Sequence, residues 1–317
     1  MQIRLFLILA GFLGAQAAFG QQAESVTTAE KDTAEVSAAY RYPELMAAED
    51  TLKILALQII EPLADSARLE NNRRFYAKLT EVLSREESFR YPFDSLLTVS
   101  MLVPPDSAFR IITWYVPLQG QRFVYFGLIQ RPQGDAAGGK AAGSSGLIPL
   151  HDSTGTIRSA VFTELSAEAW YGAYYYEILH HRTGDTDLYT MLGWKGNNPH
   201  TRMRVIEPMW FSEGQAVFGK QVFRIGQRDP FRVVFEYSAF SSMSLVYDFH
   251  PVRSGQDPVG MIVFDRLSPG DESLRGQYRF YLPEANIFDA LIFEDGRWVF
   301  YPDVDARAPE PQAAEGG

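Results

Sequence analysis

Residues 188–211 read LYTMLGWKGNNPHTRMRVIEPMWF, two runs rich in apolar and aromatic side chains on either side of a short polar segment. The spacing of the first run ends a strand at about Trp194, so residues 195–198 must reverse the chain. Glycine and asparagine tolerate the left-handed backbone conformation that such a turn needs, and Pro199 keeps Asn198 out of the helical region. The stretch therefore predicts two neighbouring strands joined by a turn.

The same pattern extends on both sides of this stretch, as short runs rich in Val, Ile, Phe, Tyr and Trp between turn-forming residues. FRIITWYV (109–116) and RFVYFGLIQ (122–130) predict one hairpin. YGAYYYEIL (171–179) and LYTMLGW (188–194) predict another, with HHRTGDTD as its turn. The Asp-Gly of EDGR (294–297) predicts a tight hairpin turn. Because the connections are mostly too short for crossover helices, we expect an antiparallel β domain over residues 91–305.

The architecture of this β domain has two alternatives. Leu188, Phe231 and Tyr278 open three successive groups of strands at nearly regular spacing, as the blades of a propeller would. Propeller blades normally carry four strands, however, and no turn signature repeats along the chain. The sequence therefore predicts a mainly β fold, an antiparallel meander that is either sandwich-like or propeller-like.

A helical hairpin is predicted ahead of the β domain, over residues 40–90. Two apolar stripes recur at steps of three and four residues, as a helix face requires; they consist of Leu52, Leu55, Ile59 and Leu63, and of Phe75, Leu79, Val82 and Leu83. Pro62 should end or kink the first helix.

The first twenty residues, MQIRLFLILAGFLGAQAAFG, have the pattern of a secretory signal peptide. Arg4 precedes an uncharged apolar run, and Ala18 and Gly20 suit the signal peptidase, which predicts cleavage after Gly20. A membrane anchor is the competing interpretation, but the apolar run is short and a polar segment follows it. We therefore expect an exported protein, periplasmic or secreted, with a mobile segment at 21–39 and no transmembrane segment after cleavage.

Composition excludes several classes of function. The 317-residue chain has no cysteine, which excludes disulfides, thiolate metal sites and a lipoprotein attachment site. Its formal charge of −10 and the lack of a clustered basic face argue against nucleic-acid binding. Residues 131–146, RPQGDAAGGKAAGSSG, have the composition of a flexible loop, and 306–317 that of a disordered tail.

No motif of nucleophilic catalysis, metal binding or phosphate binding is present. The chain lacks a GxSxG elbow, and the adjacent residues His151, Asp152 and Ser153 cannot form a triad among themselves, so we interpret them as a turn. His180 and His181 are neighbours on a strand and should face apart. The glycine-rich segment lacks the Lys-Ser/Thr pair of a phosphate loop. No metal and no cofactor is therefore expected.

Paired carboxylates keep a glycosidase-like hydrolase open as an alternative. Six acidic residues lie in or beside predicted strands: Glu177, Glu207, Glu236, Asp248, Asp265 and Asp289. Two of them could meet across a sheet and act as acid and base. Solvent-facing acids on alternating strands explain the same pattern.

A binding role is the main hypothesis, and it falls on the opening stretch. Trp194 and Lys195 at the rim of a sheet, with the amides of Asn197 and Asn198 beside them, form a candidate site for a polar ligand. Aromatic side chains are abundant; exposed rings stack on sugars, although strands also favour aromatic residues for packing. Replacing Trp194 and Lys195 by alanine would separate a turn from a turn that also binds.

The run YTMLGWKGNNPHTRMRVIEPMWF (189–211), with FRIITW upstream and RVVFEYSAFSSMSLVYD and MIVFDRLSP downstream, resembles a family of uncharacterised exported bacterial proteins with an LGWxGNN-type motif. The similarity covers about residues 93–304 and implies a common fold and export, without any functional residue. The sequence thus predicts a binding or interaction module of the cell envelope, whose partner is a polar ligand or an envelope protein. A secreted hydrolase and a structural partner in an envelope complex are the alternatives.

Overall fold

The computed structural model describes residues 42–61, 63–132, 146–226, 229–252 and 256–306. The predicted signal peptide (1–20) and the segment 21–39 lie outside these residues, as do most of 131–146 and of 306–317. Two compact units divide the chain, Met1–Asp50 and Thr51–Gly317. The features that follow belong to the second unit, except that helix α3 begins in the first.

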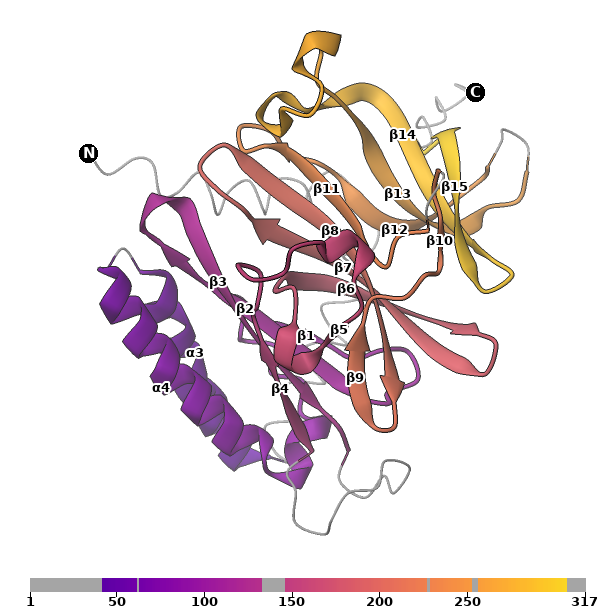
Figure 1. The fold of residues 1–317 in the computed structure, drawn as a ribbon. Helices are drawn as coiled ribbons and strands as arrows, with labels where there is room; N and C mark the ends of the chain where they lie inside the picture. Colours follow the sequence, from indigo (N-terminus) through magenta and orange to yellow (C-terminus); the bar gives the residue numbers. More distant parts are fainter. Residues whose placement is uncertain (1–41, 62, 133–145, 227–228, 253–255, 307–317) are drawn as a thin grey trace, which may run out of the picture. The chain divides into compact units, whose positions relative to one another are not determined.

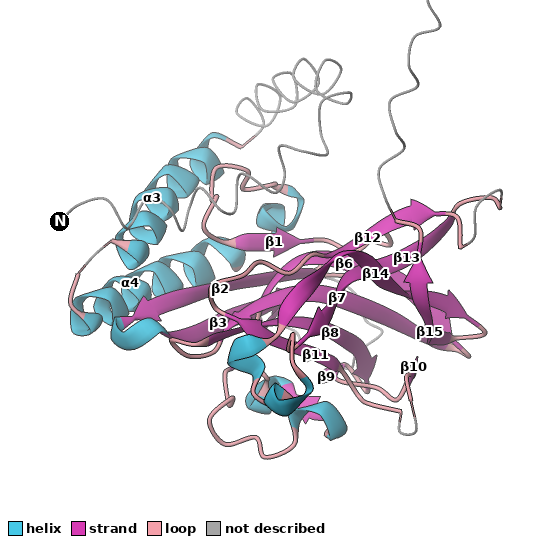
Figure 2. Ribbon diagram, turned by 90° about the horizontal axis from the view of Figure 1, so that it is seen from above, coloured by secondary structure: helices cyan, strands magenta, loops and turns pink. Residues whose placement is uncertain are grey.

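The predicted two-helix region is confirmed, with α3 at Pro43–Ile60 and α4 at Asp65–Leu83 (Figure 1). Helix α3 ends two residues before Pro62, as a proline requires. Helix α4 buries Phe75 and Leu79 completely and lies beside strand β2 (Arg110–Leu118) (Figure 2). The indole N–H of Trp114 on β2 donates to Asn72 Oδ1 at 2.7 Å, which fixes the helix on the sheet.

Three sheets form the β domain, and its antiparallel pairing is confirmed with one exception. The first sheet has the order β1 (Ser100–Leu102), β2, β3 (Arg122–Gln130) and β4 (Leu147–His151). The second has the order β5 (Leu165–Ser166), β9 (Gln215–Phe218), β8 (Thr201–Ser212), β7 (Thr186–Gly196) and β6 (Tyr174–Thr183), and β11 (Val233–Ser238) also pairs with β8. The third has the order β10 (Phe223–Arg224), β15 (Arg297–Val304), β14 (Leu282–Glu294), β13 (Val259–Ser268) and β12 (Leu245–His250). Only β10 and β15 pair in parallel among these strands of the described residues. Short 3-10 helices are η1 (Glu86–Arg90), η2 (Gln119–Gln121), η4 (Ala160–Phe162), η5 (Ala167–Ala169), η6 (Glu272–Leu274) and η7 (Tyr278–Phe280).

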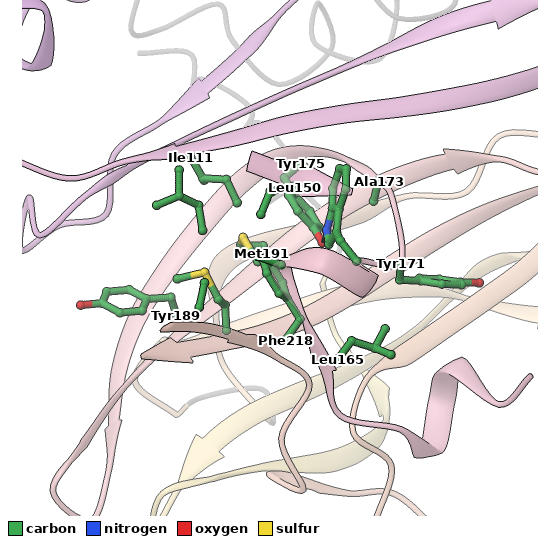
Figure 3. Close-up of a cluster of buried hydrophobic side chains, with 14 of the residues drawn as sticks. Ile111, Leu150, Leu165, Tyr171, Ala173, Tyr175, Tyr189, Met191 and Phe218 are labelled. Carbon is green, nitrogen blue, oxygen red and sulfur yellow. Dashed lines mark hydrogen bonds between the residues drawn. The ribbon is translucent and has the colours of Figure 1, made fainter. Parts of the chain in front are cut away.

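The sheet that contains β7 is buried on both faces. One face of β7 places Tyr189 and Met191 in a cluster with Ile111 and Leu150 of the first sheet (Figure 3). The other face places Leu188 and Leu192 in a second cluster, with residues of the third sheet that include Ile262, Leu291 and Trp298. A strand buried on both faces reads as a continuous apolar run, which explains LYTML. The layered, sandwich-like alternative is therefore the one observed, and the sheets do not form propeller blades.

The predicted hairpins are present, and two of the strand ends need correction. Asp295 and Gly296 have φ angles of 48° and 78°, so the EDGR turn has the expected positive φ at both central positions. Strand β7 continues to Gly196, where Gly196 pairs with Arg202, so the chain reverses at 197–200 rather than 195–198. Strand β6 continues to Thr183, so the turn predicted for 180–187 is only Gly184 and Asp185. The residues that continue these two strands are polar or glycine, so the apolar pattern ended before the strands did.

Among the described residues, no helix combines the length and the apolar character needed to cross a bilayer.

Candidate functional site

The turn between β7 and β8 is closed by the side chain of Asn198. The Asn198 Oδ1 accepts from the backbone N–H groups of His200 (2.8 Å) and Thr201 (3.0 Å). The backbone N–H of Asn198 donates to the Thr201 carbonyl at 3.3 Å. Asparagine is suited to this local bonding because its amide is short enough to reach the backbone two or three residues on. The turn predicted from Gly-Asn-Asn-Pro is therefore a rigid one.

The rigid turn holds a carboxylate that comes from another strand. Glu236 lies on β11, opposite Met203 of β8. Its Oε1 accepts from Asn197 Nδ2 at 2.9 Å and from Thr201 Oγ1 at 2.6 Å. Thr201 Oγ1 in turn accepts from the side-chain amides of Asn197 (2.8 Å) and Asn198 (2.9 Å). Both asparagine amides thus position one oxygen of Glu236, while within the described chain no hydrogen bond reaches its Oε2.

This carboxylate lines a shallow pocket of about 350 Å³ that is open to solvent. Its volume is at the lower end of the range of roughly 300–1,000 Å³ that is typical of small-molecule sites. The turn, β11 and the segment around η7 supply the walls, which consist of Asn198, His200, Thr201, Glu236, Gln277, Tyr278 and Arg279. Three segments distant in sequence therefore converge on one concavity.

Exposed aromatic rings lie around the pocket. Tyr278, in its wall, is 45% exposed, and Phe280 follows two residues later. Phe240 is 90% exposed and is held beside the turn because the preceding residue, Ala239, donates its N–H to the His200 carbonyl at 2.8 Å. An exposed ring costs hydration free energy, so three of them near one pocket are consistent with contact to a ligand.

Trp194 lies away from this pocket, in an aromatic cluster. Its ring centroid is 5.4 Å from that of Tyr115 and 5.3 Å from that of Phe123, both on the first sheet. The neighbouring Gly196 donates its N–H to the Tyr125 hydroxyl at 2.6 Å. The Trp-Lys-Gly part of the motif therefore joins two sheets, whereas Asn198 lines the pocket and Asn197 contacts Glu236.

Lys195 lies inside the protein and not at the rim of the sheet, because β7 continues past it. Its side chain is 2% exposed. The ammonium donates to Thr154 Oγ1 at 2.8 Å, to the Tyr171 carbonyl at 2.7 Å and to the Gly172 carbonyl. It also lies 4.4 Å from the ring centroid of Tyr125. Burial lowers the pKa of Lys195 to about 8, against the opposing effect of Asp152 and Glu207.

Glu207 and Arg232 form a second buried charged group, on β8 and just before β11. Both side chains are fully buried, with Arg232 Nε 2.9 Å from Glu207 Oε1 and 3.0 Å from Oε2. Arg232 also donates to the carbonyls of Ala160, Thr163 and Phe218. Burial raises the pKa of Glu207, and the facing guanidinium opposes this shift. This pair was not predicted from the sequence, where its one signal is a lone Glu inside the apolar run RVIEPMW.

Each of the six acidic residues of the hydrolase alternative has its own partners, and among the six the charge of Asp248 adds to the raised pKa of Glu177. Glu177 accepts from the Tyr247 N–H at 3.3 Å, and Asp265 from the Ser244 N–H at 2.7 Å. Asp289 pairs with Arg266, Asp248 with His250, and Glu207 with Arg232. Burial raises the pKa of Glu177 and of Asp265. Of the six, Glu236 alone lines the pocket that the described residues form.

The histidine segments have structural partners. Asp152 accepts from the Thr154 and Tyr125 N–H groups, at 3.0 and 3.1 Å, so its carboxylate organises the expected turn. His180 lies 3.0 Å from Asp187 Oδ1, whereas the His181 ring packs 4.2 Å from Phe293, so the two histidines face apart. Within the described part of the chain, no group of three or more His, Cys, Asp or Glu residues is arranged to hold a metal ion.

Comparison with known proteins gives no match: no family model, no curated protein and no solved structure matches this chain. The resemblance of the LGWxGNN-type motif to exported bacterial proteins therefore stays a prediction.

Proposed function

We propose that this protein is a binding module that takes a polar ligand in the pocket between the β7–β8 turn, β11 and η7. The observation that carries the proposal is the carboxylate of Glu236. One of its oxygens is fixed by Asn197 and Thr201, and the other has no hydrogen bond within the described residues. A carboxylate whose orientation is set by its neighbours loses little entropy when it binds a donor, so it favours recognition of a ligand.

Binding fits this site better than hydrolysis. Two carboxyl groups must face each other across a scissile glycosidic bond, and Glu236 has no second acidic residue beside it among the residues that line the pocket. The other five acidic residues have partners outside the pocket. Glu207, for example, is fully buried against Arg232. Together with the predicted signal peptide, this supports a binding role in the cell envelope or outside the cell.

Thermal denaturation of the full chain tests the proposal with a collection of amino acids, short peptides, organic acids and mono- and disaccharides. A ligand that binds the folded state raises the midpoint temperature in a concentration-dependent way. We expect at least one compound to stabilise the wild type, and Glu236→Gln to lose that stabilisation while it keeps its own midpoint, since glutamine retains the shape of the side chain.

Glu168→Gln is the matched control, because it makes the same chemical change on a side chain that is 77% exposed and outside the pocket. This control should respond to the compound as the wild type does. Equal responses of all three proteins would refute the pocket as the site. Turnover of a glycan that disappears in Asp265→Asn would favour the hydrolase alternative.

A further inference from the structure

We infer that the ligand is a zwitterion, a short peptide with free ends, held between Glu236 and Arg279; this inference rests on the proposed function. The pocket has an acid from β11 in one wall and a guanidinium from η7 in another. A ligand that carries both an ammonium and a carboxylate satisfies both groups at once.

Arg279 supplies the positive side of the pocket. Its guanidinium lies over the ring of Phe280, 4.6 Å from the centroid, and within the described residues it has no hydrogen bond and no ion pair. Arg275, four residues earlier, is paired with Glu272 at 2.8 Å. The planar guanidinium binds a carboxylate through two parallel hydrogen bonds, and the ring beneath it limits its motion.

Glu236 supplies the negative side. Its Oε1 is occupied by Asn197 and Thr201, which leaves Oε2 as an acceptor for an ammonium group. No charged partner lies among its hydrogen-bond donors. An ammonium is a better partner here than a sugar hydroxyl, because it adds the attraction of an opposite charge to the hydrogen bond that either group can donate.

The overall charge of the chain and the volume of the pocket are also consistent with a zwitterionic ligand. The chain carries a formal charge of −10, which repels an anionic polymer at long range but not a ligand with no net charge. The volume of about 350 Å³ accommodates a dipeptide, and the exposed rings of Tyr278 and Phe280 offer contacts for its side chains.

Equilibrium dialysis of the full chain against a library of all dipeptides of the standard amino acids, read by mass spectrometry, is the experiment. We expect a subset of dipeptides to be retained. The best retained one is then compared with its N-acetyl and its C-terminal amide forms, each of which lacks one charge. Each modification should weaken binding about tenfold in the wild type, the effect of losing one charge-assisted hydrogen bond.

Two variants then assign each charge to its partner. In Glu236→Gln the N-acetyl form should bind as well as the free dipeptide, and in Arg279→Gln the C-terminal amide should do so, because the protein no longer distinguishes them. Arg275→Gln, outside the pocket, should behave as the wild type. Such a pattern of matched losses does not arise from misfolding, which would weaken all forms together.

Retention of no dipeptide, or equal binding of free and blocked forms by the wild type, would overturn the inference. If a neutral saccharide stabilises the wild type but not Glu236→Gln while no dipeptide is retained, the proposed function stands and the zwitterion is refuted. If no compound of either kind binds, both fail.

Discussion

At the scale of the residue, the two polar parts of the GWKGNNPHT segment have separate tasks. Lys195 is buried and joins β7 to the carbonyls of Tyr171 and Gly172. Asn197 and Asn198 both donate to Thr201, which donates to Glu236, and Asn197 also donates to Glu236 directly. The sequence predicts one candidate site from Trp194, Lys195 and the two asparagines. Of these residues only Asn198 lines the pocket, and Asn197 contacts its carboxylate, Glu236. The strand ends two residues later than the pattern indicated, which places Trp194 and Lys195 elsewhere.

Burial of Lys195 makes the stability of the protein depend on pH. The pKa of Lys195 is about 8 in the folded protein and 10.5 for the unperturbed side chain. Between these values the folded state has lost the proton that the unfolded state still binds, so stability rises with pH. From about pH 7 to about pH 9.5 this group should add about 2 kcal/mol to the free energy of unfolding. Above this range the tyrosines oppose the trend, since burial raises the pKa of Tyr171 and of Tyr174 to about 12.

Lys195→Met should remove this dependence, and urea unfolding at a series of pH values measures it. At pH 7 the variant should be less stable by about 1–3 kcal/mol, because the carbonyls of Tyr171 and Gly172 lose their donor. The difference from the wild type should grow towards pH 9.5. Lys53→Met, on the exposed side of α3, is the control and should follow the wild type. Parallel curves for the wild type and Lys195→Met would show that the ammonium is not the titrating group.

At the scale of the element, the β7–β8 hairpin shows which features the sequence could predict and which it could not. Apolar runs, Gly-Asn turns and Asp-Gly turns are local signals, so the strands and the helical hairpin follow from them. Strand ends are set instead by pairing with distant strands: Gly196 continues the ladder because Arg202 lies opposite. The glycine is needed there for a reason that is not local, since a Cβ would lie 2.3 Å from the ring of Phe123.

Gly196→Ala should therefore destabilise the protein although alanine suits a strand better than glycine. The Phe123 ring has little room to move, because it packs edge-on against both Tyr115 and Trp194. We expect a loss of about 1–3 kcal/mol in the free energy of unfolding, the usual cost of overpacking. Gly155→Ala is the matched control, because a Cβ there has no atom within 4 Å and φ is not positive. Equal stabilities of the two variants would contradict the close approach of β7 and β3.

At the scale of the whole molecule, the described residues of the second unit are held together by layers of sheets, and strand β7 of the middle sheet is buried on both faces. The pattern of residues predicted strands without saying which faces meet, because both alternating sets of β7 are apolar. The charged pair Glu207 and Arg232 lies in one of the two interfaces and binds the carbonyls of Ala160 and Thr163. Removing one partner of such a pair destabilises the folded protein by several kcal/mol, because the other charge stays buried without a partner.

The pocket also belongs to this scale, and the sequence predicted only part of it. Glu236 lies 39 residues after Asn197 in the chain, and η7 lies further on. No spacing rule connects such segments; the pairing of β11 with β8 brings Glu236 to the turn. From the sequence, Glu236 is a candidate only as one of six acids, and Gln277, Tyr278 and Arg279 are not predicted as site residues.

The most direct measurement is where a ligand contacts the protein, by NMR chemical-shift mapping of the isotope-labelled full chain. With the compound that stabilises the wild type, we predict that the largest shifts fall on the backbone amides of His200, Thr201, Glu236 and residues 277–279, and that Glu236→Gln abolishes them. Largest shifts at Tyr115, Phe123 and Trp194 instead, or shifts unchanged in Glu236→Gln, would contradict the claim that the turn holds a carboxylate for ligand binding.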